Sequence, residues 1–401
     1  MRAKTICMSV FNDLSMDARV YREAKTLKRE GYEVSVVGIK ERGSAPESPW
    51  PGIGIVRVPI SLGRKPFAKA RYLEHFLKLT ATLLRTKADA YHAHDLDTLL
   101  ACWVASRAKR AKLVYDVHEM MVEESAVQKR PVTRAIWLIL ERLLICKADA
   151  VLTVNNSIAA ELARRYQIEP PRVLMNCPEL RRIAKTGELR KILKIGPSQW
   201  IVLHQGGLLP GSGLEVLVES LRRVENVVLV FLGRGPAREQ LQLMADSMGL
   251  GDRVRFLDPV PFEALPRYTA SSDLGLAIVK NAGLSYFLSL PNKIFDYMMA
   301  GVPILTSNFP ERQRIVTENG TGLAVDPSDP RRVAQGIESI LKDRESYRKM
   351  AANCRRAAKR YNWERESVKL TEIYQWLFRE DQASPHPQRS SVRTNFPGKA
   401  Q

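Results

Sequence analysis

The chain has 401 residues, which is too long for one typical hydrophobic core and therefore predicts two domains. Its hydrophobic content of 45% and charged content of 26% are ordinary for a globular protein. Five scattered cysteines without paired spacing indicate a reducing compartment and argue against a disulfide framework or a zinc site. The net charge of +19 is concentrated in residues 1–200, which hold 35 Lys and Arg against 21 Asp and Glu, so this half suits an anionic partner.

Apolar runs typical of strands alternate with helical patterns along the first half of the chain. The expected strands are Thr5–Val10, Val34–Ile39, Ile55–Pro59, Ala88–Ala93, Lys112–Tyr115, Ala150–Val154 and Val173–Met175. The clearest helices between them are Ala18–Glu30, Phe67–Leu84, Leu96–Ala108 and Ser157–Tyr166. This alternation predicts a parallel, doubly wound sheet.

The same alternation restarts in the second half of the chain. Its expected strands are Trp200–His204, Val227–Leu232, Val254–Leu257, Leu274–Val279, Pro303–Thr306 and Gly322–Val325. The predicted domains are 1–180 and 199–362, joined by a polar, weakly periodic linker at 181–198. A further helix is expected at 363–380, and the tail 381–401, rich in Pro, Ser, Gln and Arg, is expected to be disordered.

Neither a signal peptide nor a membrane-spanning helix is expected. The N-terminal apolar run Ile6–Phe11 is too short for a signal peptide, and the apolar helix Ile136–Cys146 is short and interrupted by charges. We therefore expect a cytoplasmic protein. Two basic segments with interleaved aromatic residues, Arg64–Lys78 and Lys129–Arg134 with the apolar run after it, suit a membrane interface. They could equally be packed helices with solvated basic faces, and nucleic acid is not expected as a partner.

Two glycine-rich turns follow predicted strands of the second half. The strand ending at His204 leads into Gln205-Gly-Gly-Leu-Leu-Pro-Gly-Ser-Gly213 and then a helix, and Leu232-Gly-Arg-Gly-Pro236 follows the next strand. Such turns let backbone N–H groups approach an anion, and ligands of doubly wound sheets bind at the carboxyl ends of the strands. The alternative is that these glycines only serve tight turns.

The segment Ser289–Pro303 predicts one short helix with a charged face. Pro291 suits the first turn, and Gly301 with Pro303 marks the end. Lys293, Asp296 and Tyr297 share one face, opposite the core-like Ile294, Phe295, Met298 and Met299. A cation followed one turn later by a carboxylate suits a ligand with phosphate at one end and hydroxyls at the other. An ordinary surface pair on an amphipathic helix is the alternative.

Taken together, these motifs resemble the GT-B glycosyltransferases, specifically the retaining family 4 type. The resemblance covers most of Trp200–Phe378 through the ordered motifs Gly206-Gly207, Leu232–Pro236, Pro291–Pro303 and Asn319-Gly-Thr-Gly322. In the first half, His92-Ala-His-Asp-Leu-Asp97 and Tyr115-Asp-Val-His-Glu119 resemble strand ends that line the family's acceptor side. The fold implied is GT-B: two Rossmann-like doubly wound domains facing a cleft, with the C-terminal helix crossing back to the N-terminal domain.

The resemblance also implies site residues. Those expected at the donor diphosphate are Gly206, Gly207, Gly211, Ser212, Arg234 and Lys293. Those expected at the donor ribose or sugar are Asp296, Asn281, Ser285, Tyr286 and Asn292. His118 and Glu119 are the catalytic candidates, and His94, Asp95, Asp13 and Arg19 are expected on the acceptor side. His92 and His94 are expected to point to opposite faces of an extended strand, so no shared metal and no cofactor are expected.

Several positions depart from the family pattern. Gly207 and Ser212 stand where many members carry diphosphate-binding cations, and Leu288 stands where they carry the first of two glutamates. Asp296 stands in place of the second glutamate, which binds the ribose. More of the diphosphate charge therefore falls on Lys293, Arg234 and backbone N–H groups.

The expected function is transfer of a sugar from a nucleotide sugar to a lipid-linked or polysaccharide acceptor, with retention of configuration, in cell-surface glycan biosynthesis. The expected location is cytoplasmic or peripheral on the cytoplasmic face of the inner membrane, whose anionic surface is a candidate partner. The alternatives are a catalytically impaired nucleotide-sugar-binding protein and a GT-B nucleotide-sugar epimerase.

Overall fold

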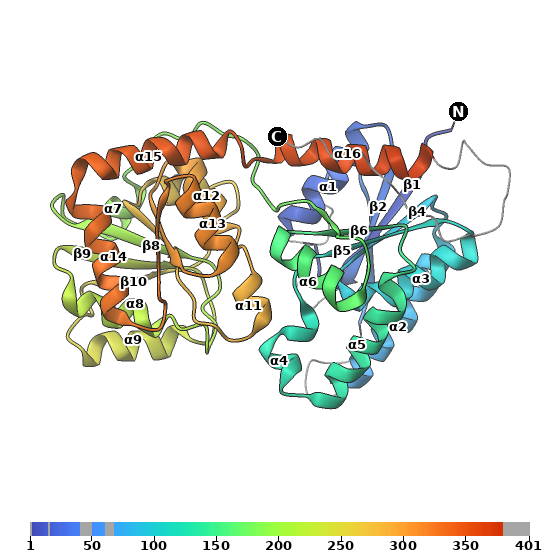
Figure 1. Ribbon diagram of the computed structural model, residues 1–401, viewed down its shortest axis with the longest axis horizontal. Helices are drawn as coiled ribbons and strands as arrows, with labels where there is room; N and C mark the ends of the chain where they lie inside the picture. The colour runs from blue at the N-terminus through green and yellow to red at the C-terminus, as the bar shows by residue number, and fades with distance from the viewer. Residues whose placement is uncertain (1, 15–16, 41–49, 61–67, 380–401) are drawn as a thin grey trace.

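The computed structural model describes residues 2–14, 17–40, 50–60 and 68–379, which form two parallel β-sheets with helices on both faces (Figure 1). The predicted tail at 381–401 and the start of the basic segment Arg64–Lys78 lie outside these residues. Along the described helices, none combines the length and apolar character needed to span a bilayer.

The first sheet has seven parallel strands in the order β3-β2-β1-β4-β5-β6-β7. Its strands are β1 Thr5–Ser9, β2 Glu33–Lys40, β3 Gly54–Pro59, β4 Ala90–His94, β5 Lys112–Val117, β6 Ala150–Thr153 and β7 Arg172–Val173. Its α-helices are α1 Ala18–Arg29, α2 Ala68–Arg85, α3 Leu96–Lys109, α4 Ser125–Gln128, α5 Pro131–Ile145 and α6 Asn156–Tyr166, with a 3-10 turn, η1, at Met121–Glu123.

The second sheet has six parallel strands in the order β10-β9-β8-β11-β12-β13. Its strands are β8 Trp200–Gln205, β9 Val227–Leu232, β10 Val254–Leu257, β11 Leu274–Ala277, β12 Ile304–Ser307 and β13 Gly322–Val325. The helices around it are α7 Glu188–Ile192, α8 Glu215–Ser220, α9 Arg238–Ser247, α10 Leu265–Ala270, α11 Leu284–Leu288, α12 Lys293–Ala300, α13 Pro310–Glu318, α14 Pro330–Lys342 and α15 Arg344–Ala358, with the turn η2 at Leu221–Arg223.

Burial explains why the central strands read as continuous apolar runs. Every residue of β9, Val-Val-Leu-Val-Phe-Leu, is buried, because helices cover both faces of the sheet. In each sheet the strand order reverses once, between β1 and β4 and between β8 and β11. Ligands of doubly wound sheets bind outside the strand ends at this reversal. The fold therefore places the ends of these four strands in the candidate site.

The last helix, α16 Trp363–Arg379, returns to the N-terminal sheet and runs beside α1 (Figure 1). Trp363 Nε1 donates to Thr26 Oγ1 over 2.9 Å, and the Tyr374 hydroxyl lies 2.9 Å from His92 Nδ1. The predicted arrangement of two doubly wound domains with a crossing C-terminal helix is confirmed.

Three local expectations were wrong. The helix expected at Ile136–Cys146 begins earlier, at Pro131, because proline is favoured at the first helical position. The helix α12 begins at Lys293, so Pro291 precedes its first turn; Gly301 does end it, in a left-handed conformation with φ 67°. Tyr297 does not join Lys293 on an open face: it is buried, and its hydroxyl donates to the Leu203 carbonyl over 2.9 Å.

Candidate functional site

A cavity of about 350 Å³ lies between the two domains. Its walls come from α1 and Pro178–Arg181 on one side and from α10 and α12 on the other. Of the residues predicted for the donor, Asp296 is the one that lines it. Its other walls include Tyr21, Arg22, Trp50 and Phe262, which no motif in the sequence indicated.

Asp296 is held in place by the end of strand β8. Gln205 Nε2 donates to Asp296 Oδ2 over 2.9 Å, and Thr269 Oγ1 in turn donates to Gln205 Oε1 over 2.8 Å. Burial raises the pKa of Asp296 to about 6, although Arg22 and the Gln205 hydrogen bond oppose that rise. Asp296 also lines the interdomain cavity, where a carboxylate can accept hydrogen bonds.

Lys293 lies one helical turn before Asp296 and points at the glycine-rich loop after β8. Its Nζ is 3.3 Å from His204 Nε2 and 3.5 Å from the place where a Cβ at position 206 would be. Burial and the nearby Arg312 lower the pKa of Lys293 to about 7. An anion arriving at the loop would supply the missing counter-charge and restore the protonated amine.

The two glycine-rich turns of the C-terminal domain pack directly against each other. A Cβ at Gly233 would lie 1.9 Å from the Gly206 carbonyl oxygen, and one at Gly235 would lie 2.1 Å from that of Leu208. The Leu208 amide donates to the Arg234 carbonyl over 3.0 Å, while the Arg234 side chain stays exposed. Glycine is required here for close backbone approach, so these turns form a rigid rim around exposed Gly206 and Gly207.

Gly211 and Ser212, both predicted at the diphosphate, differ in burial. Gly211 is exposed, whereas Ser212 is buried and its hydroxyl donates to the Leu209 carbonyl over 2.6 Å, which fixes the loop. Next to it, Gly213 has φ +79° and a Cβ there would lie 2.3 Å from Cγ of Lys280. The side chain of Lys280 thus packs against this loop at Gly213, and the Lys280 backbone N–H donates to the Ser212 carbonyl over 2.9 Å. No sequence motif indicated Lys280, because it follows a different strand, β11.

The segment before α12 joins the two domains. Leu288 is buried with the apolar core of the N-terminal domain, and its carbonyl accepts from Asn155 Nδ2 over 3.0 Å. Ser157 Oγ donates to Glu311 Oε1 over 2.9 Å nearby. Leu288, which the resemblance equates with a glutamate of the family, is therefore an interdomain packing residue.

The other predicted sugar-side residues are spread around this segment. Ser285 is buried, Tyr286 is partly buried, and Asn281 and Asn292 are exposed. Asn281 Oδ1 accepts from the Gly283 amide over 3.0 Å, which closes a local turn. The structure thus leaves Asn292 and Tyr286 as the members with exposed polar atoms that are not committed to a turn.

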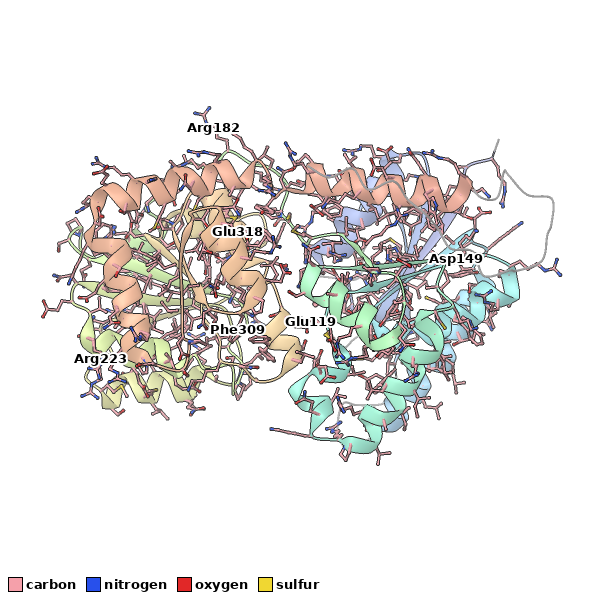
Figure 2. The ribbon with its side chains drawn as sticks, viewed as in Figure 1. Glu119, Asp149, Arg182, Arg223, Phe309 and Glu318 are labelled. Atoms are coloured by element: carbon pink, nitrogen blue, oxygen red, sulfur yellow. The ribbon has the colours of Figure 1, made fainter. Side chains whose placement is uncertain are left out.

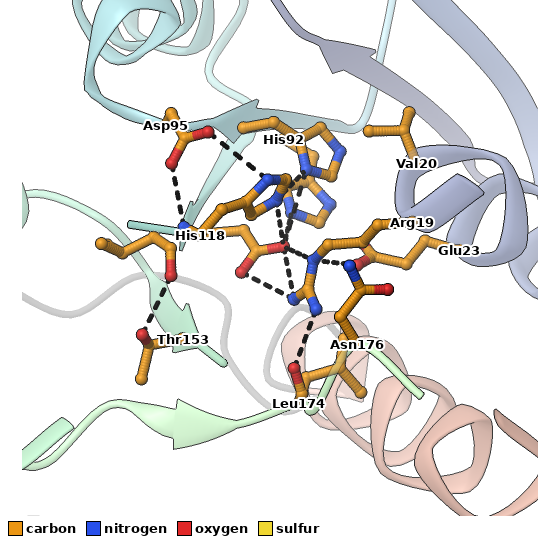
Figure 3. A network of polar contacts seen from close by, with 12 residues as sticks. Arg19, Val20, Glu23, His92, Asp95, His118, Thr153, Leu174 and Asn176 are labelled. Carbon is orange, nitrogen blue, oxygen red and sulfur yellow. Dashed lines mark hydrogen bonds and ion pairs between the residues drawn. The ribbon is translucent and has the colours of Figure 1, made fainter. Parts of the chain in front are cut away.

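A buried ion-pair network underlies the N-terminal side of the site (Figure 3). Arg19 donates from Nε and Nη2 to the Asp116 carboxylate over 3.0 and 2.8 Å, and its Nε is 2.9 Å from Glu23 Oε1. Burial opposes charge on Asp116, but Arg19 and His118 outweigh it and hold the pKa of Asp116 well below its usual range. Arg19, predicted on the acceptor side, is buried and reaches a ligand only through these partners.

His118 sits on top of that network, at the end of β5. Its Nε2 lies 3.1 Å from Asp116 Oδ2, its Nδ1 lies 3.4 Å from Asp95 Oδ2, and its backbone N–H donates to Asp95 Oδ1 over 2.9 Å. Burial disfavours the charged ring, but Asp95 and Asp116 overcome this and raise the pKa of His118 to about 9. At neutral pH His118 is therefore a cation and a hydrogen-bond donor.

Asp95 carries backbone strain at this point. Its φ of 65° is unusual for a residue other than glycine, and its amide donates to the Asp116 carbonyl over 2.9 Å. Strained backbone of this kind clusters at functional sites. The strain lets the Asp95 carboxylate reach both the ring and the backbone of His118.

The expectation that His92 and His94 point to opposite faces was wrong. Residues two apart in a strand share a face, and the two rings stack with centroids 4.3 Å apart. Both side chains are buried, and neither Nε2 has a hydrogen-bond partner among the described residues. Oxygen or nitrogen atoms of Glu23, His92, His94 and Asp116 lie within 4.8 Å of one another, as in a metal site. However, the Arg19 guanidinium already supplies the positive charge there, so we interpret the cluster as an ion-pair network.

The remaining two candidates lie at the rim. Glu119 has an exposed side chain beside the gap between the domains (Figure 2); partial desolvation by the surrounding protein, together with Asp95, raises its pKa. Burial and Glu119 raise the pKa of the neighbouring Glu124 to about 7. Asp13 is partly buried, and its carbonyl accepts from Arg57 Nε over 3.1 Å. His118 and Glu119 are thus adjacent at the cleft, while Asp13 belongs to another loop.

Two Rossmann-like domains with a cavity between them, a glycine-rich loop after β8 and the Asp296 carboxylate at that cavity have the arrangement of a GT-B protein. Family comparison agrees. Residues 185–359 match the family "Glycosyl transferases group 1", and residues 16–178 match the "Glycosyl transferase 4-like domain". The chain belongs to the group 1 glycosyltransferases, that is, to family 4, and is a glycosyltransferase that uses a nucleotide-sugar donor.

Individual relatives are distant. The chain is 24% identical over 388 residues to a D-inositol 3-phosphate glycosyltransferase of Xylanimonas cellulosilytica, covering 90% of this chain and 91% of that protein. It is 30% identical over 196 residues to a GDP-mannose-dependent alpha-(1-6)-phosphatidylinositol monomannoside mannosyltransferase of Mycobacterium tuberculosis, covering 47% and 51% of the two chains.

Solved structures support the fold. Sucrose-phosphate synthase from Thermosynechococcus elongatus matches with a TM-score of 0.80 and 19% identity, covering 94% of this chain and all of that one (100%). The Anabaena protein HepE in complex with UDP-glucose matches with a TM-score of 0.74 and 16% identity, covering 93% and 100%.

Proposed function

We propose that this enzyme transfers a hexose from a nucleotide sugar to a lipid-linked or polysaccharide acceptor, with retention of anomeric configuration, in cell-surface glycan biosynthesis. The observation that carries the proposal is the pairing of Lys293 and Asp296 on α12. Lys293 faces the glycine-rich loop and Asp296 faces the interdomain cavity. One helix can then hold the diphosphate and the ribose of the same donor.

In this proposal the departing diphosphate is stabilised by Lys293, by Arg234 and by the backbone N–H group of Gly207; the Gly206 N–H already donates to the Leu232 carbonyl over 2.9 Å. These groups act where negative charge develops as the glycosidic bond breaks. Lys293 gains a proton as the diphosphate binds, since its pKa in the free protein is only about 7. Lys280, which packs against the same loop, is a further cation available to it.

On the other side of the cleft, His118 and Glu119 would hold the acceptor against the anomeric carbon. As an imidazolium whose Nε2 faces Asp116 and whose Nδ1 faces Asp95, His118 contributes positive charge beside the acceptor and is not expected to act as a base at neutral pH. Glu119 is exposed next to it and can accept a hydrogen bond from an acceptor hydroxyl.

The acceptor class is supported by the two curated relatives, whose names give an inositol phosphate product or substrate and a phosphatidylinositol mannoside. Both names describe polyols carrying phosphate. The strongly basic N-terminal half of this chain suits such anionic acceptors.

A thermal-shift screen of the common nucleotide sugars tests the donor, because a ligand of the native state raises the melting temperature by mass action. The donor that shifts it is then incubated with phosphoinositides, lipid-linked sugars and oligosaccharides, and nucleotide release is measured. The anomeric proton signal of the first product formed reports retention or inversion. Inverted product would contradict the retaining assignment.

The Lys293→Ala variant provides the sharpest test of the site. Loss of a desolvated cation–diphosphate contact should weaken donor binding by about 2–3 kcal/mol, or about 30- to 150-fold. The matched control is Lys342→Ala on α14, an exposed lysine whose loss should leave the donor Kd unchanged. Donor affinity that is equal in both variants would show that the donor binds elsewhere.

A non-catalytic nucleotide-sugar-binding protein is the second candidate. It is favoured by three positions: Gly207 offers no side chain, Ser212 is committed to its loop, and Leu288 packs between the domains. A donor that shifts the melting temperature but is not turned over with any acceptor would support this candidate.

A further inference from the structure

Helix α5 carries a row of large apolar side chains on its outer surface. Val132, Ile136, Ile139 and Leu143 are 71%, 61%, 60% and 60% exposed. Their spacing of four, three and four residues places them on one narrow face of the helix. We call these four residues the α5 stripe.

The stripe is not the side of α5 that packs onto the domain. That role belongs to other residues of the helix, including Trp137, Leu140 and Leu144, which join the apolar core of the N-terminal sheet. Surface helices normally pair one apolar face with a polar one. This helix is apolar on both its inner and its outer face, and packing within the chain explains only the inner one.

Helix α2 adds to the same region. The rings of Tyr72 on α2 and Trp137 on α5 meet edge to face, with centroids 6.1 Å apart. Leu73 and Leu77 of α2 are 59% and 57% exposed. Of the 14 large apolar side chains that are exposed among the described residues, seven belong to these two helices, so the exposed apolar surface is concentrated here.

The exposed charged residues within 129–147 all have one sign. Residues 129–147 contain five cations, of which Lys129, Arg130, Arg142 and Lys147 are exposed. Their single acid, Glu141, is buried and accepts a hydrogen bond from the Tyr115 hydroxyl over 2.8 Å. An apolar stripe flanked by cations alone is complementary to an interface that is apolar beneath and anionic at its surface.

We propose that the α5 stripe is a membrane-docking surface that inserts into the interface of an anionic lipid bilayer, with Lys129, Arg130, Arg142 and Lys147 against the headgroups. A second copy of the chain fits less well, because an isologous dimer would bring these like charges together. Fifteen residues give α5 a length of about 22 Å, enough to lie along the membrane plane.

This inference rests on the proposed function, and it gives that function a location for the acceptor. Helix α5 contacts η1 and α4, the two elements that follow Glu119, so docking through α5 would hold this part of the N-terminal domain near the lipid surface. A lipid-linked acceptor then needs to leave the bilayer only by its headgroup.

The test is binding of the full chain to vesicles with about 30% phosphatidylserine and to purely zwitterionic vesicles, measured by cosedimentation. We expect binding to the anionic vesicles, weakened about tenfold or more in about 0.5 M salt. The Ile136→Ser/Ile139→Ser variant should weaken binding about tenfold, and Leu243→Ser, an equally exposed residue on α9, should not.

Charge is tested with a matched pair. Arg130→Gln/Arg142→Gln should weaken binding to anionic vesicles about 30-fold, since each of the two cations contributes about 1 kcal/mol near such a surface. Arg222→Gln/Arg223→Gln removes the same charge from the far end of the C-terminal domain (Figure 2) and should have no effect.

Cys146 offers a direct probe of insertion. It is the exposed one among the five cysteines, and it continues the stripe one turn after Leu143. An environment-sensitive fluorophore on Cys146 should shift to shorter wavelength with anionic vesicles and not with zwitterionic ones.

Three results would overturn the proposal: no binding to anionic vesicles, equal binding by the Ile136→Ser/Ile139→Ser and Leu243→Ser variants, or a wild-type dimer that the stripe variant dissolves without any vesicle binding. Donor binding is measured in the same variants by thermal shift and should be unchanged. Failure to bind any nucleotide sugar would contradict the proposed function and leave the vesicle result standing.

Discussion

The two walls of the cleft hold charge in opposite ways. On the N-terminal side, Arg19, Asp116 and His118 are charged before any ligand arrives, because each is paired with an opposite charge. On the C-terminal side, Lys293 and Asp296 are partly buried without a close ion pair, and their pKa values of about 7 and about 6 lie far from their usual ones. The charges of the N-terminal wall are therefore paired within the protein, whereas those of the C-terminal wall are not.

The largest effect is expected from breaking the buried network of the N-terminal wall. Arg19→Met leaves the buried carboxylate of Glu23 without its counter-charge and that of Asp116 with His118 alone, which should cost about 3–5 kcal/mol of the free energy of unfolding. Urea denaturation measures it. Arg222→Met, an exposed arginine, should change stability by about 0.5 kcal/mol or less. Similar costs for the two variants would mean that the network is not what stabilises this wall.

In the C-terminal wall, the next largest effect is expected from a change that separates the backbones of the two glycine-rich turns. Gly233→Ala places a Cβ 1.9 Å from the Gly206 carbonyl, so the two turns must separate. We expect a loss of about 3 kcal/mol of stability, together with weaker donor binding. Gly211→Ala meets no atom within 4 Å and carries only the cost of its φ of +77°, about 1 kcal/mol. If both variants bind the donor like the wild type, close packing of the turns is not needed for the site.

The two walls should also differ in how the effect of a histidine substitution on stability depends on pH. The folded pKa of His118, about 9, lies above its usual value of 6.5, so its stabilisation is fully present below pH 6.5 and is lost as pH rises through 9. His118→Gln should therefore destabilise on the order of 2 kcal/mol at about pH 6 and much less at about pH 10.

His204 on the other wall should show the opposite dependence. Burial and Lys293 hold the pKa of His204 well below 6.5, so below that pH the unfolded chain binds a proton that the folded chain does not. The cost of His204→Gln should shrink as pH falls. Denaturation series across pH for both variants test this; parallel curves would contradict the assigned charge states.

The smallest expected effect is the uptake of a proton by Lys293 when the donor binds. Since the free pKa of Lys293 is about 7 and a bound diphosphate raises it, donor binding at about pH 8 should take up close to one proton, and affinity should fall about tenfold per pH unit above 7. Calorimetry in buffers of different ionisation enthalpy measures the uptake. Lys293→Met removes the titrating amine, so any uptake that survives in this variant would have to come from another group.

Most of the fold could be predicted from local patterns of apolar and turn residues in the sequence. The expected strands at Val227–Leu232, Val254–Leu257 and Gly322–Val325 have the bounds found in the structure, because apolar runs between turn residues report burial in a parallel sheet. The glycine-rich turns and the spacing of Lys293 and Asp296 were equally readable, since a motif carries its own geometry over a few residues.

Tertiary structure decided what each side chain does. The sequence by itself determined two doubly wound domains, the family and the chemistry gathered at the strand ends. Only the fold could show that Arg19 is buried against Asp116, that Lys280 packs against the loop at Gly213, and that Leu288 packs on the other domain. The exposed face of α5 likewise looked no different from a core face in sequence. Pairing, burial and pKa depend on neighbours distant along the chain, and periodicity and motif spacing carry no information about them.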